Sequence, residues 1–180
     1  ERNPRPSING YMYGNANAMV AMWQLKGDAT KAADYLQKAK TVKAATQSKL
    51  WNSEHDFFEV RKEQGDTLAA VKEAIGFIPW YFNMPDSSYN IAWKSLTDTK
   101  TFCAPFGITT ADRSHPQFRT HGCCKCEWDG AVWPFATAQT LTGMANLLQV
   151  QPAPYVSKQD YFQLLNTYVE SQYYRGRPYI

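Results

Sequence analysis

Residues 126–140 read Cys-Glu-Trp-Asp-Gly-Ala-Val-Trp-Pro-Phe-Ala-Thr-Ala-Gln-Thr, and this stretch governs the interpretation of the whole chain. Trp128 and Trp133 stand on either side of Gly130, a residue that lets the backbone turn tightly. Pro134 then occupies a favoured first position of a helix. The sequence therefore predicts a loop that leads directly into a helix, whose first free N–H groups can meet oxygen atoms of a ligand.

Apolar residues recur at helical spacing after Pro134 and in three other segments of the chain. The four stripes are Phe135, Ala138, Leu141, Ala145 and Leu148; Met12, Ala16, Met19, Val20 and Trp23; Ala32, Leu36, Ala39 and Val42; and Tyr161, Leu164, Leu165 and Tyr168. Gly27 is a helix stop, and Asp28 is an N-cap for the next helix, so two helices are joined by almost no loop. These features predict an all-α fold built from antiparallel helix pairs.

The remaining segments are shorter or irregular. Residues 51–66 carry strand-forming aromatics among charges and are expected to be extended, whereas residues 68–78 and 87–96 are expected to form short helices. Residues 99–133 contain scattered Pro and Gly and predict a long irregular loop before the Trp128–Trp133 motif. A structureless loop of that length in a compact domain is usually either functional or a segment whose secondary structure has been assigned wrongly.

Composition limits the classes of function. The chain of 180 residues, 44% hydrophobic and 19% charged, is predicted to form one folded domain over residues 1–180. A net charge of +3 is too small for a nucleic-acid interface, and no apolar run is long enough to span a membrane. Because no signal peptide begins at Glu1, we expect a processed or cytosolic chain, with a periplasmic or extracellular location favoured. The aromatic content of 14% suits a concave ligand site.

The cysteines raise the alternative of a metal site. Cys123, Cys124 and Cys126 lie beside His121, and Cys103 is the fourth cysteine. Thiolates and imidazole suit zinc, but this spacing differs from the usual Cys-x2-Cys. We therefore expect no metal and no cofactor. The thiols are expected to pack together, or to form one disulfide with Cys103 in an oxidising compartment.

Motifs for other kinds of catalysis are missing from the sequence. It contains no glycine-rich phosphate loop, no HExxH and no Gly-x-Ser-x-Gly. Two pairs of carboxylates, Glu54 with Asp56 and Glu127 with Asp129, are each separated by one residue. Residues at that spacing point in different directions, so neither pair is expected to face itself across a scissile bond as glycoside hydrolysis requires.

Residues 128–134, Trp-Asp-Gly-Ala-Val-Trp-Pro, resemble the Trp-Arg/Asn-Gly-Pro-x-Trp-Pro motif of a glycosidase superfamily that includes α-glucosidase I, trehalase and mannosylglycerate hydrolase. Residues 5–16, 50–58 and 73–82 resemble further blocks of its bacterial members, in the expected order. The resemblance implies an (α/α)6 barrel and hydrolysis with inversion. Asp129 and Ala131 depart from the motif, and an acid at position 129 would change how a sugar hydroxyl is bound.

The length of the chain limits what this resemblance implies. About twelve helices close such a barrel, whereas the sequence predicts six, so the chain is expected to be part of an (α/α)6 toroid. The resemblance places the general acid before Arg5 and the general base after Tyr173, outside this chain. It implies carbohydrate as the partner, and the rest of the barrel or complementary chains as neighbours. The residues expected on the substrate side are Asn9, Tyr13, Trp80, Glu127, Trp128, Asp129, Trp133 and Gln139.

These residues carry specific expectations. Trp128, Asp129 and Trp133 are predicted to face one concave pocket together with Trp80, with the tryptophans stacking on a sugar. Asp129, Gln139 and Asn9 would bind its hydroxyl groups. Two alternatives stay open: a helical module that binds carbohydrate without cleaving it, and a helical protein that binds zinc through its Cys and His residues.

Overall fold

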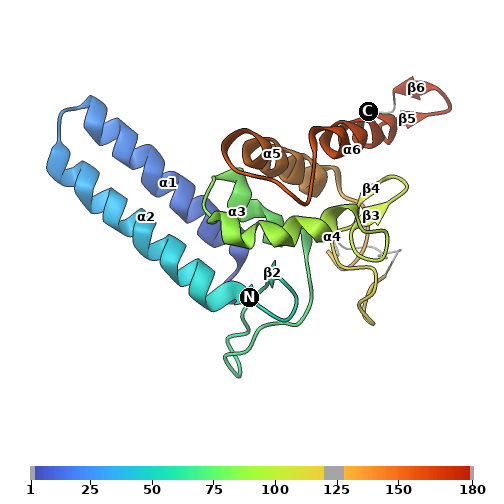
Figure 1. Cartoon of the computed structure of the whole chain (residues 1–180), viewed down its shortest axis with the longest axis horizontal. Helices are drawn as coiled ribbons and strands as arrows, with labels where there is room; N and C mark the ends of the chain where they lie inside the picture. Colours follow the sequence, from blue (N-terminus) through green and yellow to red (C-terminus); the bar gives the residue numbers. More distant parts are fainter. Residues whose placement is uncertain (1–2, 120–127, 179–180) are drawn as a thin grey trace.

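A computed structural model describes residues 3–119 and 128–178 of the chain (Figure 1). It is mostly helical, as predicted, and its only sheets in the described residues are three antiparallel hairpins of two-residue strands. The α-helices are α1 (Pro6–Leu25), α2 (Ala29–Leu50), α3 (Ile78–Tyr81), α4 (Lys94–Thr97), α5 (Pro134–Val150) and α6 (Lys158–Glu170), and the 3-10 helices are η1 (Ala74–Phe77) and η2 (Ser87–Trp93). The strands are β1 (Trp51–Asn52), β2 (Phe57–Phe58), β3 (Cys103–Ala104), β4 (Gly107–Ile108), β5 (Tyr173–Tyr174) and β6 (Arg177–Pro178).

Helices α1 and α2 form the predicted antiparallel hairpin, which projects away from the rest of the chain (Figure 1). Gly27 adopts φ 75° after the end of α1, and the Asp28 carboxylate accepts a hydrogen bond of 3.0 Å from the backbone N–H of Lys31. This cap satisfies one of the free N–H groups at the start of α2. The tight connection therefore follows from local sequence alone.

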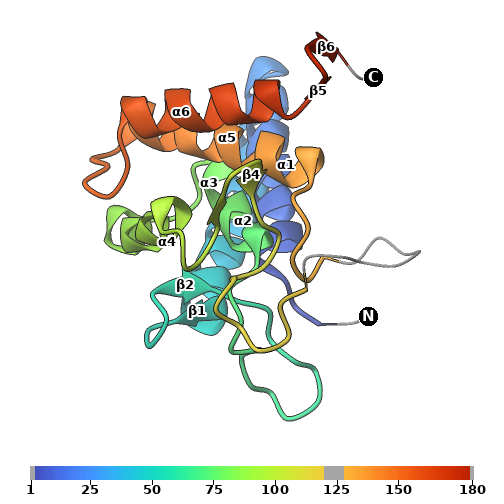
Figure 2. The ribbon, with the colours of Figure 1, turned by 90° about the vertical axis from the view of Figure 1, so that its right-hand side faces the viewer.

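The other helices pack around a core that lies at the base of the hairpin. Helix α3 contacts both α1 and α5, and α6 lies along α5 (Figure 2). The fully buried large side chains are Trp80, Trp93, Phe57, Phe58, Phe77, Phe102, Leu50, Met84, Ile108, Met144 and Leu147, together with Glu59. Half of these side chains are aromatic, and they come from α3, η1, η2, β2 and the segment after α4.

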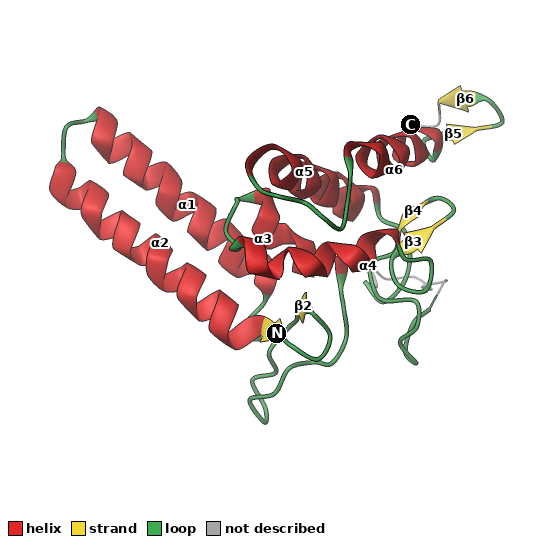
Figure 3. Ribbon diagram, viewed as in Figure 1, coloured by secondary structure: helices red, strands yellow, loops and turns green. Residues whose placement is uncertain are grey.

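The segments between the helices are also held in place, by short antiparallel strand pairs and isolated bridges. Residues 51–66 are extended at β1 and β2, as expected, and η2 followed by α4 confirms the short helix predicted over residues 87–96. The long loop contains the β3–β4 hairpin, and Thr109 pairs with Val132 in an isolated bridge (Figure 3). This bridge brings the segment before Pro134 onto the β3–β4 hairpin.

The helix predicted over residues 68–78 is shorter than expected, because its first half is extended. The backbone N–H of Ala69 donates to the carbonyl of Val60 at 2.8 Å, and Glu73 forms a bridge with Ala111. Ala70 adopts φ 57°, which is incompatible with a right-handed helix. Pairing with distant segments therefore overrides the local helical tendency. In the described part of the chain, no helix is long and apolar enough to cross a membrane.

Candidate functional site

A pocket of about 420 Å³ lies where the first turns of α1 and α5 meet the segment that leads into η1. Its walls combine aromatic, aliphatic and polar side chains. The lining residues are Arg5, Ser7, Ile8, Tyr11, Glu73, Ile75, Ile78, Trp128, Phe135 and Gln139. Three segments that are far apart in sequence thus supply one concave surface, which we call the Trp128 pocket.

The aromatic wall is a stack built from the Trp128–Trp133 motif. The rings of Trp128 and Trp133 are stacked with centroids 5.2 Å apart, and the ring of Phe135 packs edge-on against Trp128 with centroids 6.3 Å apart and an interplanar angle of 90°. Gly130 makes the turn between the tryptophans. Its N–H donates to Thr110 Oγ1 at 3.1 Å, and a Cβ at this position would collide with the carbonyl of Arg119. The stack leaves Trp128 half-buried, with a face available at the pocket.

The polar wall is held by a hydrogen bond between helices. Gln139 Nε2 donates to the Tyr11 hydroxyl at 2.5 Å, which joins the first turns of α5 to α1. Gln139 is only 8% exposed, whereas Tyr11 is 38% exposed and packs edge-on against Phe82. Because a buried amide is costly to leave unpaired, this bond fixes the position of both side chains.

Glu73 is the carboxylic acid among the described lining residues of this pocket. Burial raises its pKa above that of an ordinary carboxyl, Arg5 opposes this shift, and the nearby Glu59 carboxylate adds to it. A carboxyl with a raised pKa can donate a hydrogen bond as well as accept one, because more of it is protonated at a given pH. The pocket therefore combines aromatic faces with donors and acceptors in a partly dehydrated space.

The structure brings some of the predicted site residues together. Trp128 and Gln139 both line the pocket, and Trp133 stacks on Trp128. The prediction for Trp80 is wrong, because this residue is 0% exposed and its ring packs edge-on against Trp93 and Phe58. Its Nε1 donates to Asn90 Oδ1 at 2.9 Å, so Trp80 is part of the core and does not reach the pocket.

The other predicted residues do not line the Trp128 pocket. Asp129 pairs with Arg119 and borders a separate hollow with Pro116 and Gln117. The Asn9 amide donates to the carbonyl of Arg5 at 2.8 Å, within its own helix. Tyr13 lies on α1 outside the lining, and Glu127 lies outside the described residues. The expectation that Asp129 shares one pocket with Trp128 is therefore corrected.

Tyr11 and Glu73 were missed by sequence reasoning, although the sequence does mark the packed face of α1. Gly10 and Gly14 are four residues apart on α1, and a Cβ at Gly14 would collide with the ring of Phe82. Such spacing of small residues marks the face on which another segment packs closely. Tyr11 and Tyr13 flank that face on opposite sides, so the spacing marks where α1 packs and does not by itself select Tyr11. Glu73 carries no comparable local signal, since its position depends on pairing with Ala111.

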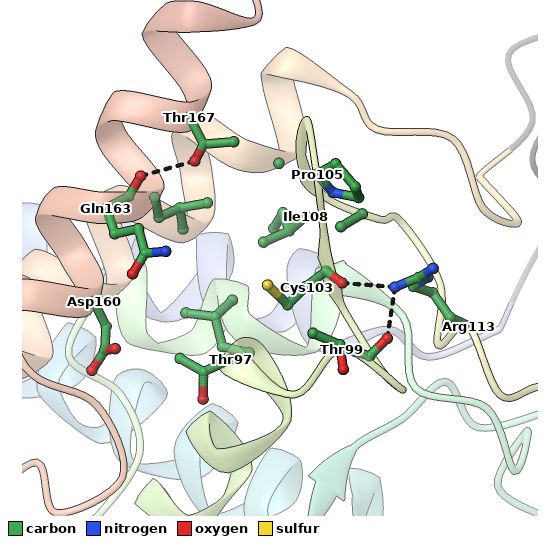
Figure 4. A pocket seen from close by; sticks show the side chains of 13 residues that line it. Thr97, Thr99, Cys103, Pro105, Ile108, Arg113, Asp160, Gln163 and Thr167 are labelled. Carbon is green, nitrogen blue, oxygen red and sulfur yellow. Dashed lines mark hydrogen bonds between the residues drawn. The ribbon is translucent and has the colours of Figure 1, made fainter.

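A second cavity, of about 510 Å³, lies between α6 and the β3–β4 hairpin (Figure 4). Cys103, which is free, lines it, and Arg113 Nη1 donates to the carbonyls of Thr99 and Cys103 at 2.6 and 2.9 Å. The predicted partners of Cys103, namely His121, Cys123, Cys124 and Cys126, lie outside the described residues. Within the described ranges, no group of His, Cys, Asp and Glu is arranged to hold a metal ion.

Comparisons with solved structures show a shared fold. A sialidase is 54% identical with a TM-score of 0.94; the match covers 99% of this chain and 16% of the sialidase. The GH63 mannosylglycerate hydrolase from Thermus thermophilus in complex with glucose is 16% identical with a TM-score of 0.65, covering 93% of this chain and 38% of that one. An uncharacterized conserved protein from the same organism is 15% identical with a TM-score of 0.70, and the match covers 91% of this chain and 38% of that protein.

The chain thus spans well under half the length of each of these proteins. A search of curated proteins gave no match. The sequence model of the mannosylglycerate hydrolase MGH1-like glycoside hydrolase domain matches residues 1–180. Together with the GH63 fold match, this confirms the resemblance to the (α/α)6 glycosidases. The chain belongs to the MGH1-like glycoside hydrolase family, and it forms a part of such a domain.

Proposed function

We propose that the Trp128 pocket binds a sugar unit of a glycoside whose bond the domain hydrolyses with inversion. The observation that carries this proposal is the meeting of Trp128 with Gln139, Tyr11 and Glu73 at one cavity. An indole face suits the C–H face of a sugar ring, and the amide, hydroxyl and carboxyl groups suit its hydroxyls. The family membership and the glucose complex of a GH63 relative support the same class of ligand.

The pocket supplies contacts to the substrate and not the proton transfers. Inverting hydrolysis uses two carboxyl groups about 6.5–9.5 Å apart, one as general acid and one as general base. Among the described residues, Glu73 is the single carboxylic acid that lines the pocket. We therefore assign both proton-transfer roles to residues outside this chain, as the resemblance implies, and we assign hydroxyl binding to Glu73 and Gln139.

The pair of Asp129 and Arg119 is proposed as an additional polar contact. Asp129 directly follows Trp128, and its carboxylate is held by the Arg119 guanidinium. A carboxylate in such a pair still has lone pairs for a sugar hydroxyl, so Asp129 acts in this proposal as an acceptor and not as a proton donor. Glycosides that extend beyond the first sugar would reach this pair.

Two exposed apolar faces are proposed to contact the rest of the domain or a complementary chain. Helix α6 has no buried residue, and Phe162 and Val169, seven residues apart on one face, are 54% and 47% exposed. On the α1–α2 hairpin, Met12, Met22 and Leu36 are 53%, 56% and 41% exposed. Exposed apolar patches of this kind mark interaction surfaces, and relatives with the same fold have far longer chains.

Glucose binding tests the proposed function. Addition of glucose to the protein should perturb the NMR signal of the Trp128 indole N–H, and Trp128→Ala should abolish binding. Trp23→Ala is the matched control, because Trp23 is a half-buried tryptophan at the far end of α1, where Lys26 and Lys31 cover its ring. Binding that survives Trp128→Ala, or that is lost equally in Trp23→Ala, would contradict the assignment of the pocket.

A further inference from the structure

A buried carboxylate stands directly after β2 and has no place in the binding contacts described above. Glu59 follows β2, and its side chain is 0% exposed. Three donors converge on it: His55 Nδ1 at 2.5 Å from Oε1, Asn52 Nδ2 at 3.1 Å from Oε2, and the backbone N–H of Ala70 at 2.9 Å from Oε2. Buried carboxylates are costly unless they are paired in this way, so the site is specifically built.

The Ala70 contact ties this network to the pocket. Ala70 adopts φ 57°, a conformation that costs a residue with a Cβ about 1 kcal/mol or more and persists only where its surroundings impose it. Glu73, which lines the pocket, follows three residues later and is paired with Ala111. The Glu59 carboxylate therefore holds one end of the segment 70–73 whose other end carries the pocket carboxyl.

His55 completes the arrangement on the solvent side. Its ring is 37% exposed, and its Nδ1 faces Glu59, so the imidazole covers the buried carboxylate at the β1–β2 turn. Asn52 Oδ1 accepts from the backbone N–H groups of Glu54 and His55 at 2.9 and 3.4 Å, which fixes the turn. The exposed neighbours Glu54 and Asp56 belong to the same turn.

We infer that Glu59 and His55 are positioning residues for the Trp128 pocket: the His55-capped Glu59 carboxylate fixes the backbone at Ala70 and thereby sets the place of Glu73 in the pocket lining. This inference rests on the proposed function only for its effect on sugar binding. The charged groups that act on Glu73 are Arg5 on the chain just before α1 and Glu59 itself, and the Glu59 charge raises the pKa of Glu73. Both routes, through the backbone and through charge, lead from Glu59 to the same carboxyl.

The test combines three measurements on Glu59→Gln and His55→Ala. Hydrogen exchange reports the Ala70 amide, carboxyl 13C NMR reports the titration of Glu73, and indole NMR reports glucose binding. In both variants, exchange at Ala70 should accelerate about tenfold or more, because a hydrogen bond to a charged group is weakened. The pKa of Glu73 should fall, since the like charge is removed in Glu59→Gln and the carboxyl becomes better hydrated in both. Glucose binding should weaken.

Two controls separate positioning from general damage. Glu54→Gln removes a carboxylate next to His55 without touching Glu59, and Ala70→Gly relieves the φ of 57° while it keeps the donor N–H. Neither should change the titration of Glu73. If Glu59→Gln does not fold, His55→Ala at the half-exposed ring decides the question alone.

The outcomes are distinguishable. An unchanged Ala70 exchange rate and Glu73 titration in Glu59→Gln overturn the inference, even where the wild-type protein binds glucose. A response in Glu59→Gln with none in His55→Ala overturns the role of His55. Responses at Ala70 and Glu73 in a protein that binds no glucose refute the proposed function and leave the coupling established.

Discussion

Trp128 and Trp133 stack with their ring planes 22° apart, although only four residues separate them. The turn at Gly130 makes this possible, and it aligns both indoles before Pro134 starts α5. One indole therefore supports the other. Trp133 backs the ring whose face lines the pocket, and its contribution to binding is expected to be indirect.

Replacement of Trp133 by Ala should weaken glucose binding more than it weakens folding, because it removes the support of Trp128 at a partly exposed site. Glucose titration and urea denaturation of the same variant measure the two effects. Trp80→Ala is the contrasting variant: its ring is fully buried, and its loss should cost about 3–5 kcal/mol of stability. A Trp133→Ala protein with unchanged binding and a large loss of stability would show that Trp133 is a core residue.

Tyr11→Phe should destabilise the protein by about 1–3 kcal/mol, because it leaves the buried Gln139 amide without its partner. The double variant Tyr11→Phe with Gln139→Leu should recover part of this loss, since both polar groups are then gone. Denaturant unfolding of the two single variants and the double variant gives the coupling energy. Strict additivity of the two losses would show that the hydrogen bond contributes nothing.

Gly130→Ala should destabilise the protein by about 1–3 kcal/mol and separate the two indoles, because the added Cβ meets the backbone of Arg119. Near-ultraviolet circular dichroism reports the change in indole packing, and denaturant unfolding reports the stability. Gly65→Ala is a control at an exposed turn with open space around it, where only the φ of 84° opposes a side chain. Equal behaviour of the two variants would contradict the close approach at Gly130.

Glu73 should make stability depend on pH in a defined direction. Burial raises its pKa in the folded state, so the folded protein holds this proton more tightly than the unfolded chain, whose carboxyl titrates near about 4.3. The resulting stabilisation is complete below that pH and is lost as the pH rises through the raised pKa. The stability of Glu73→Gln relative to wild type should therefore increase as the pH rises from about 4.3 through the raised pKa of Glu73, as measured by urea denaturation. A constant difference would contradict the raised pKa.

The exposed face of α6 should cause the isolated chain to self-associate, because Phe162 and Val169 have no cover within the described structure. Sedimentation velocity at several concentrations measures this association, and Phe162→Ser should reduce it. Phe106→Ser is the control, since Phe106 is 72% exposed but lies in the β3–β4 turn. A stable monomer at all concentrations would contradict the proposed interaction surface.

Features set by neighbouring residues could be predicted from the sequence. The Asp28 cap and the start of α5 at Pro134 both depend on contacts within four residues, and both are present. The (α/α)6 family could be identified because its motif is contiguous. These local signals were sufficient for the four long helices α1, α2, α5 and α6 and for the loop that carries Trp128.

Features set by distant partners could not be predicted. Sequence reasoning places Trp80 in the pocket, but Asn90 and Trp93 hold it in the core. Residues 68–73 have helical composition, but their backbone pairs with Val60 and Ala111. Asp129 lies next to Trp128 in sequence, yet its pairing with Arg119 directs it to a different hollow. In each case, a contact that exists only in the folded chain sets the orientation of the side chain or the conformation of the backbone. The local sequence is compatible with more than one of these arrangements, so it could not identify the correct one.

The hydrogen bond between Tyr11 and Gln139 also has a consequence for folding kinetics, because it joins residues 128 positions apart. The α1–α2 hairpin closes through nearby residues and can form early, whereas contacts at long separation must first overcome the entropy of loop closure. During synthesis, the ribosome must complete α5 before this bond can form at all. The pocket is therefore expected to assemble after the α1–α2 hairpin, so that a ligand that binds it recognises only chains in which α5 has docked onto α1.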